Sequence, residues 1–237
     1  MRGDLRLILD DSGTSRQRNQ KRWSPQQHET KPMLLYVTDF SPFARMARVV
    51  RRDQQLEERV EEKMAVTRTP NSPYYKINPS GRVPYLACDN GVGLEGSQPV
   101  CYFLDHLDGV PMLDAPDGDV GIAYRRLEEY ARSLMDGASV WLRELRRAPE
   151  DRSATIIEHE RQRLDRLADF WEGEIDHPLL QGALNMPQLT LACGLLLEEW
   201  YPGLRWREGR PRLAAWADVY AARRSFVETQ PQQKLEV

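Results

Sequence analysis

The residues with the clearest chemical potential lie in one short stretch, residues 78–86, and in the helix start that follows at Ser97. Pro84 lacks an N–H and cannot donate to a sheet ladder. It therefore belongs at the start of an edge strand or in a turn, where the Val83–Pro84 bond is a candidate for the cis form. We expect the N–H and C=O of Val83 to point outward and pair with an extended peptide as an added strand. Ser97, as helix N-cap, would direct free N–H groups at a carboxylate. The pattern predicts a site for a small peptide with a free carboxylate; the alternative is an ordinary loop, where Pro and Gly are common.

The elements that would position this stretch have a recognisable order. Apolar runs, helical spacing and an Asp-Asn-Gly turn predict, in sequence, a strand over 34–37, a helix over 43–56, a strand over 60–66, a hairpin of strands 84–88 and 92–94, and a helix over 97–107. The Pro/Asn-rich residues 69–75 are expected to be a loop. The order βαβ followed by ββα predicts a thioredoxin-like α/β region.

Everything beyond this region is predicted to be helical. Apolar stripes at three- and four-residue spacing predict helices over 122–147, 154–175, 189–200 and 211–222. Asn185 with Gln188 forms a capping box before the third of these, whose apolar residues on all faces place it at the centre of a bundle. The expected organisation is a tail (1–32), a thioredoxin-like domain (33–108), a linker (109–118), an all-helical domain (119–230) and a second tail (231–237).

Composition excludes several function classes. The 33 basic and 36 acidic residues give a net charge of −3, so no field of one sign favours nucleic acid or a membrane surface. No apolar run is long enough to span a bilayer and residues 1–30 lack the apolar centre of a signal peptide, so a cytoplasmic protein is expected. The three cysteines are widely separated, which favours buried, reduced thiols over a disulfide framework or a zinc site, and the four scattered histidines predict no metal.

With these elements in this order, the chain resembles the glutathione S-transferase superfamily, in particular its bacterial Ser-type members. The resemblance covers about residues 33–230. It depends on five features in order: Ser-Pro-Phe-Ala-Arg at 41–45, Asn-Pro-Ser-Gly-Arg-Val-Pro at 78–84, Leu-Glu-Gly-Ser at 94–97, the capping box at 185–188 and the Tyr-Pro-Gly-Leu-Arg-Trp run that begins at 201.

The resemblance implies that glutathione is the co-substrate and that its sulfur lies near the first helix. Ser41 matches the family's sulfur-contacting position, with Thr38 as the second candidate. A helix N-terminus and a hydroxyl donor both stabilise a thiolate, which favours Ser41; a plain N-cap is the alternative for that residue. The main chain at Val83 and Pro84 would hold the cysteinyl part.

The γ-glutamyl end would meet an acidic residue and Ser97. The family usually has the acid directly before this Ser, whereas here Gly96 fills that place and Glu95 precedes it. Arg82 is a candidate for the glycyl carboxylate, and Arg45, one turn into the first helix, is a further candidate for binding glutathione.

A pocket for a small apolar electrophile would lie against the helical domain. Its candidate lining residues are Phe43, Tyr130, Met135 and Trp141. The resemblance also implies a homodimer and a role in detoxification.

Two rival functions remain open. One is a non-catalytic member that keeps the fold as a binding or stress-regulatory module, suggested by Gly96. The other is a thiol-disulfide oxidoreductase, which is disfavoured because Ser41 stands where its attacking cysteine would be. Neither the sequence nor the resemblance identifies the electrophile.

Overall fold

The computed structural model describes residues 32–107 and 109–234 of the 237 in the chain. The predicted tail 1–32 therefore lies outside the described residues except for its last position, and the tail 231–237 is described as far as Lys234. Within the described residues, no helix is long and apolar enough to cross a membrane.

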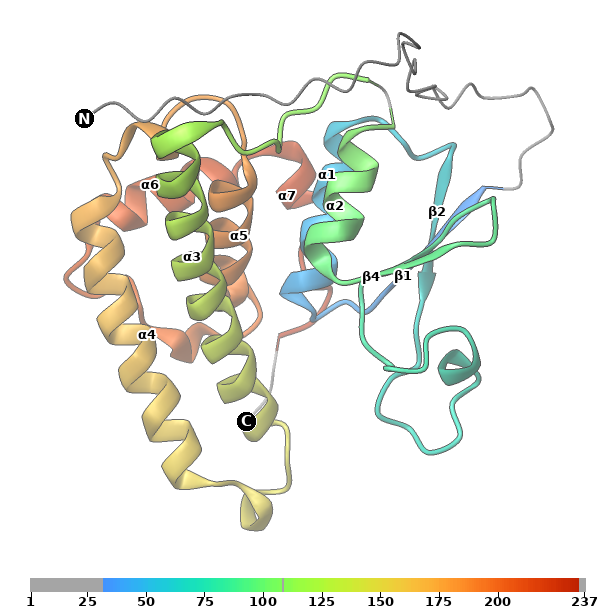
Figure 1. Cartoon of the computed structure of the whole chain (residues 1–237). Coiled ribbons are helices and arrows are strands. Elements are labelled where there is room, and N and C mark those ends of the chain that lie inside the picture. Colours follow the sequence, from blue (N-terminus) through green and yellow to red (C-terminus); the bar gives the residue numbers. More distant parts are fainter. Residues whose placement is uncertain (1–31, 108, 235–237) are drawn as a thin grey trace, which may run out of the picture. The chain divides into compact units, whose positions relative to one another are not determined.

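A four-stranded mixed sheet forms the first part of the fold (Figure 1). Its strands are β1 (Met33–Val37), β2 (Val60–Met64), β3 (Tyr85–Ala87) and β4 (Gly93–Glu95), arranged in the order β2-β1-β3-β4. β1 pairs with β2 in parallel and with β3 antiparallel. The central strand β1 buries Met33, Leu35 and Val37, which alternate along it as a strand packed on one core requires. This arrangement confirms the predicted thioredoxin-like order.

The helices α1 (Pro42–Asp53) and α2 (Ser97–Asp105) pack against each other and lie between the sheet and the helical region in Figure 1. Ser41 caps α1 by accepting the Ala44 N–H, and Pro42 occupies the first turn, where a missing N–H costs nothing. The predicted end of this helix at residue 56 is wrong. The chain leaves the helix after Asp53 because Gln55 adopts a left-handed conformation, with φ of 52°.

The remaining structure is helical, as predicted, and gains one helix that the sequence pattern missed, α7. The helices are α3 (Gly118–Leu145), α4 (Ala154–Glu174), α5 (Met186–Leu195), α6 (Pro211–Ala221) and α7 (Arg224–Val227). Short 3₁₀ helices lie at Pro73–Lys76, Pro149–Asp151, Pro178–Leu180, Leu196–Glu199 and Pro202–Leu204. The first of these falls in the stretch predicted to be a loop.

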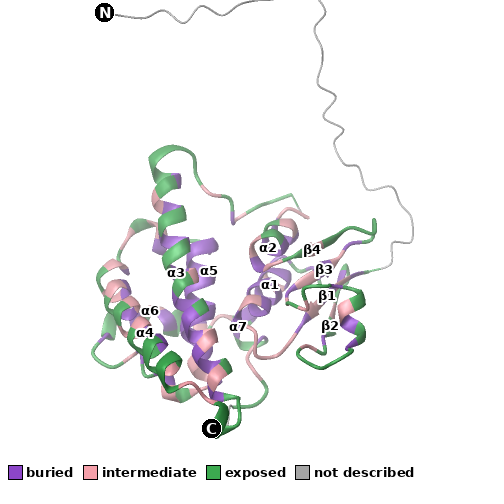
Figure 2. Ribbon diagram, turned by 60° about the horizontal axis from the view of Figure 1, so that its bottom comes forward, coloured by how far each residue is buried: buried purple, intermediate pink, exposed green. Residues whose placement is uncertain are grey.

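Helix α5 is the centre of the helical region. Asn185 and Gln188 form the predicted capping box, and all ten residues of the helix are buried, as Figure 2 shows. The helix begins three residues earlier than predicted and ends at Leu195, where the chain tightens into a 3₁₀ helix. On one side it contacts α3, and on the other it contacts α1 of the sheet region. α5 therefore joins the two parts through a shared apolar core.

A charged cluster ties α1 to strand β2. Glu62 contacts Arg48 (2.9 Å), Arg51 (3.2 Å) and Arg52 (2.6 Å). Burial alone would raise the pKa of Glu62, but the charges and hydrogen bonds of Arg48 and Arg52 outweigh it and hold this pKa below its usual 4.5.

A carboxylate whose pKa is lowered by folding stabilises the native state above its unfolded pKa. That contribution is lost as the pH falls through the folded value. We expect Glu62→Gln to lower the free energy of unfolding at pH 7 by about 1–2 kcal/mol. The gap between variant and wild type should narrow below the usual pKa of 4.5. Urea denaturation at several pH values measures this; a gap that widens in acid would contradict the assignment.

Candidate functional site

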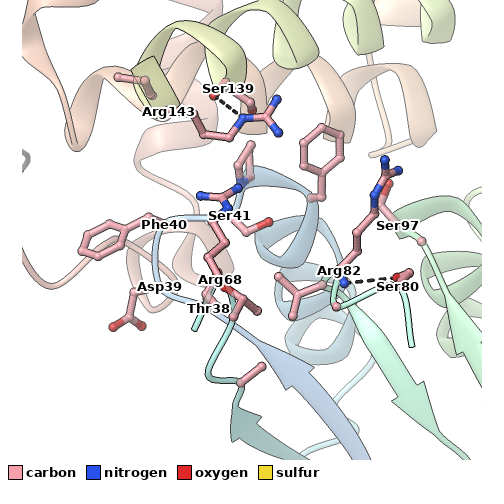
Figure 3. Close-up of a pocket in the computed structure, with 18 of the residues that line it drawn as sticks. Thr38, Asp39, Phe40, Ser41, Arg68, Ser80, Arg82, Ser97, Ser139 and Arg143 are labelled. Atoms are coloured by element: carbon pink, nitrogen blue, oxygen red, sulfur yellow. Dashed lines mark hydrogen bonds between the residues drawn. The ribbon is translucent and has the colours of Figure 1, made fainter. Parts of the chain in front are cut away.

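A cavity of about 970 Å³ opens between the sheet region and α3 (Figure 3). The sheet region contributes the β1–α1 turn, the loop after β2, the residues before β3 and the start of α2. The opposite wall comes from α3 and from the 3₁₀ helix that follows α5. The cavity brings together Thr38, Ser41, Val83, Glu95 and Ser97, all singled out from the sequence.

Ser41 offers a free hydroxyl proton at the start of α1. Its Oγ accepts the Ala44 N–H at 3.2 Å, and no acceptor for its own O–H occurs among the described residues. The Phe43 N–H, in the first turn of α1, likewise has no partner in the described part of the chain. Both groups can therefore donate to an anion in the cavity, where the helix dipole adds a favourable potential. Thr38 also lines the cavity, and its carbonyl accepts the Ser41 N–H at 3.4 Å.

The main chain at Val83 has the free groups that a peptide ligand needs. The Val83–Pro84 bond is cis, as predicted. Within residues 32–107 and 109–234, neither the N–H nor the C=O of Val83 has a hydrogen-bond partner. The preceding carbonyl, of Arg82, is held by the Tyr74 hydroxyl and by the Asn78 amide, which fixes this turn. Pro84 is buried behind the turn and does not line the cavity.

The start of α2 differs from the prediction. Ser97 is the first residue of the helix rather than its N-cap; that position belongs to Gly96, whose φ of 95° is one that only glycine adopts without strain. Ser97 is nevertheless 4% exposed, lines the cavity, and its hydroxyl has no partner among the described residues. Glu95 accepts a hydrogen bond from the Ser80 hydroxyl at the same end of the cavity.

Comparison with known proteins identifies this arrangement. The sequence profile of the glutathione S-transferase N-terminal domain matches residues 40–107. A glutathione transferase family member from Pseudomonas fluorescens Pf-5, solved with bound glutathione, is 28% identical with a TM-score of 0.75, covering 84% of this chain and 98% of its own. These matches support membership of the glutathione S-transferase superfamily.

Two further relatives agree with this membership. A glutathione S-transferase from Methylobacillus flagellatus KT, solved with glutathione bound, is 27% identical with a TM-score of 0.74, covering 84% of this chain and 99% of its own. The GST-like protein YibF of Escherichia coli K12 is 26% identical over 160 residues, which are 66% of this chain and 78% of YibF.

The two arginines that the resemblance to transferases singled out lie in different places. Arg82 is exposed, lines the cavity and rises beside Ser97 in Figure 3. Arg45 does not line this cavity. It is 4% exposed and forms an ion pair with Glu199 at 2.7 Å, and it donates to the Phe226 carbonyl at 2.9 Å. Its guanidinium joins α1 to the helical region instead of facing the place expected for glutathione.

Of the four residues predicted to line the electrophile pocket of a transferase, only Phe43 lines the cavity. Met135 is fully buried against α5, Trp141 lies in the core of the helical region, and Tyr130 stacks on Phe170 of α4. Met135 and Trp141 lie on faces of α3 that pack against other helices, whereas Tyr130 is 40% exposed at the surface beside α4. The prediction selected apolar residues, and on an amphipathic helix those are the ones that face the core.

Apart from Leu142, the residues of α3 and its C-cap that line the cavity are polar. They recur at spacings of four, three, four and three residues and are Arg132, Asp136, Ser139, Arg143 and Arg146. Phe40 and Trp200, stacked at 4.4 Å, complete this wall. The helical spacing of these five polar residues can be read from the sequence, and it could have predicted which face of α3 lines the cavity.

No metal-binding group was found among the described residues: no three His, Cys, Asp or Glu side chains come together there in a way that could hold an ion. The three cysteines are free and buried, as expected. Burial raises the pKa of Cys193 to about 12 and raises the pKa of Cys88 and Cys101 as well, which disfavours the thiolate form of all three.

Proposed function

We propose that the protein is a glutathione transferase that binds glutathione in this cavity and conjugates its thiolate to a small electrophile. The observation that carries the proposal is the pairing of two features in one cavity: an unpartnered backbone edge at Val83 and a Ser41 hydroxyl with a free proton at a helix start. Two similar bacterial proteins, at 28% and 27% identity, were solved with glutathione bound, which supports the proposal.

In this proposal glutathione lies extended, with the N–H and C=O of its cysteine paired to Val83 as an added strand. Its sulfur faces Ser41 and the Phe43 N–H. The γ-glutamyl end reaches the start of α2, where Ser97 offers a hydroxyl and an N–H that has no partner among the described residues. Because Arg82 rises beside Ser97, we assign it to the γ-glutamyl carboxylate rather than to the glycyl one expected from sequence. Glu95 is the acid available for the γ-glutamyl ammonium.

The chemical step needs no group beyond these. The thiol proton leaves to solvent, and the thiolate is stabilised by the Ser41 O–H and the helix N-terminus. The sulfur lone pair then forms a bond to the electrophilic carbon, and the leaving group departs with its bonding pair. A thiol with an ordinary pKa near 8.5 is mostly protonated at pH 7, so a drop of about two units raises the thiolate fraction roughly ten-fold or more, partly offset by lower nucleophilicity.

A titration of glutathione, followed by intrinsic tryptophan fluorescence, tests binding directly because Trp200 lines the cavity. We expect a saturable change for the wild type, and a Kd raised roughly ten-fold in Ser97→Ala, which loses a hydrogen bond to a charged group. Ser133→Ala is the matched control, an exposed serine on α3 outside the cavity. No saturable change in the wild type would contradict the proposal. Binding without turnover of any electrophile would instead favour the non-catalytic alternative.

Three further properties remain proposals. We expect a homodimer, and the exposed apolar side chains of Tyr102, Val120 and Ile122 on α2 and the start of α3 are consistent with a partner there. We also expect a cytoplasmic location and a role in detoxification. None of these is needed for the chemistry above.

A further inference from the structure

Three arginines meet in the cavity, and none of them has an acidic partner in the described part of the chain. Arg143 lies on α3, Arg146 is the C-cap of that helix, and Arg68 comes from the loop after β2. Figure 3 shows Arg143 and Arg68 reaching into the cavity from opposite walls. None of the three forms an ion pair within residues 32–107 and 109–234; the nearby Arg132, by contrast, pairs with Glu128 and Glu129 at 3.4 Å.

The contacts that these arginines do make leave their charge available. Arg143 donates through Nε to the Ser139 carbonyl at 3.0 Å, which orients the side chain and leaves its terminal nitrogens free. Arg146 lies over the Phe40 and Trp200 rings, 5.8 Å and 5.7 Å from their centroids. A guanidinium resting on aromatic rings is held in place while its N–H groups still face outward.

Arg68, Arg143 and Arg146, the arginine cluster, are close enough for their positive charges to repel one another. Loss of solvent around its guanidinium lowers the pKa of Arg68, and the positive charges of Arg143 and Arg146 lower it further.

Across the whole cavity, five arginines face three acids, Asp39, Glu95 and Asp136. Glu95 is at the far end with Ser97, and Asp39 points away from the cavity in Figure 3. Asp136 is the only one of the three on α3, between Arg132 and Arg143, and burial raises its pKa.

Apolar side chains lie beside this charge. Leu142, Leu197 and Trp200 reach this wall but are each 4% exposed or less, whereas Phe43 at the start of α1 is only partly buried. A ligand that fits this wall has an apolar body and an anionic group at one end. Guanidinium groups match a carboxylate well because they can donate two parallel N–H bonds to it.

We propose that the second substrate is an electrophile that carries a carboxylate, bound by Arg143 and Arg146 with Arg68 opposite, while its apolar body lies against Phe43. The inference rests on the proposed function, since it places this group within reach of a thiolate held at Ser41. It narrows the substrate class from any small apolar electrophile to amphipathic anions. A neutral electrophile of the same shape would leave the cluster's charges unpaired.

The test uses two glutathione conjugates of equal shape, S-(4-carboxybenzyl)glutathione and S-(4-carbamoylbenzyl)glutathione, and compares their Kd values by tryptophan fluorescence. We expect the wild type to prefer the carboxylate about ten-fold, the size of a charge-assisted hydrogen bond. The double variant Arg143→Gln/Arg146→Gln should lose this preference and keep its affinity for unsubstituted glutathione. Arg147→Gln is the matched control, because Arg147 is the next residue of the chain and does not line the cavity.

Several outcomes would overturn the inference. Equal affinity of the wild type for both conjugates, with normal glutathione binding, would refute the carboxylate site and leave the proposed function intact. If the double variant lost affinity for glutathione itself, the arginines would be holding a carboxylate of glutathione and not of the electrophile. Failure of the wild type to bind glutathione at all would instead reject the proposed function. Thermal denaturation of each variant checks that the fold is kept.

Discussion

Arg45→Ala is expected to lower the free energy of unfolding by about 3 kcal/mol without changing the affinity for glutathione. The Arg45 guanidinium is buried where α1 meets the helical region, paired with Glu199 and donating to the Phe226 carbonyl. Removing it leaves the largely buried Glu199 carboxylate without its counter-ion, with Gln230 as its remaining donor, while the Phe226 carbonyl keeps its hydrogen bonds from Thr229. A buried charge without its counter-ion costs far more than the pair itself contributes. A loss of this size is a large fraction of the usual stability of a domain.

Chemical denaturation of wild type and variant measures the loss, and the fluorescence titration at low temperature measures glutathione binding. Arg224→Ala is the control, since Arg224 pairs with Glu228 in solvent, with 90% of its side chain exposed, and no measurable change is expected. If Arg45→Ala kept its stability but lost glutathione binding, Arg45 would instead be a glutathione-binding residue, as predicted from the sequence.

Ser41→Ala is expected to reduce kcat/KM for conjugation of a nitroaryl chloride by about 10- to 100-fold. One hydrogen bond to the thiolate is worth about 1.5–3 kcal/mol, and each 1.4 kcal/mol is a factor of ten. Ser41→Thr keeps the hydroxyl and should retain most of the activity. Thr38→Val removes the hydroxyl of the second candidate and should have a small effect.

Ser41 also caps α1, so its loss costs about 1 kcal/mol of stability as well. Ser153→Ala separates the two effects, because Ser153 caps α4 by accepting the Ile156 N–H and lies outside the cavity. It should show the same loss of stability and no loss of rate. A Ser41→Ala protein with undiminished turnover would remove Ser41 from the mechanism, and a large loss in Thr38→Val would replace it with Thr38.

The thioredoxin-like order could be predicted from the sequence because local signals specify it. Pro42 after Ser41, Pro84 before a strand, an Asp-Asn-Gly turn and a capping box at Asn185 each act within a few residues, and each is present as expected. Helix ends were predicted less well. The end of α1 depends on the left-handed conformation of Gln55, which its residue type does not predict.

The electrophile side of the cavity could not be predicted in the same way. It depends on which face of α3 meets the sheet region, a long-range choice made by packing against α4 and α5. Arg45 shows the same limit. Its place one turn into α1 suggested a ligand, but its actual partners are Glu199 and Phe226, more than 150 residues away in sequence. Contacts between distant segments of the chain decide such assignments.

The most direct test of the central claim is the pKa of the glutathione thiol when it is bound to the protein, followed by the ultraviolet absorbance of the thiolate. The account predicts a value clearly below the usual 8.5 or so for the wild type, and a return toward it in Ser41→Ala. A bound thiol that titrates in the wild type as it does in free solution would contradict the claim that this cavity activates glutathione.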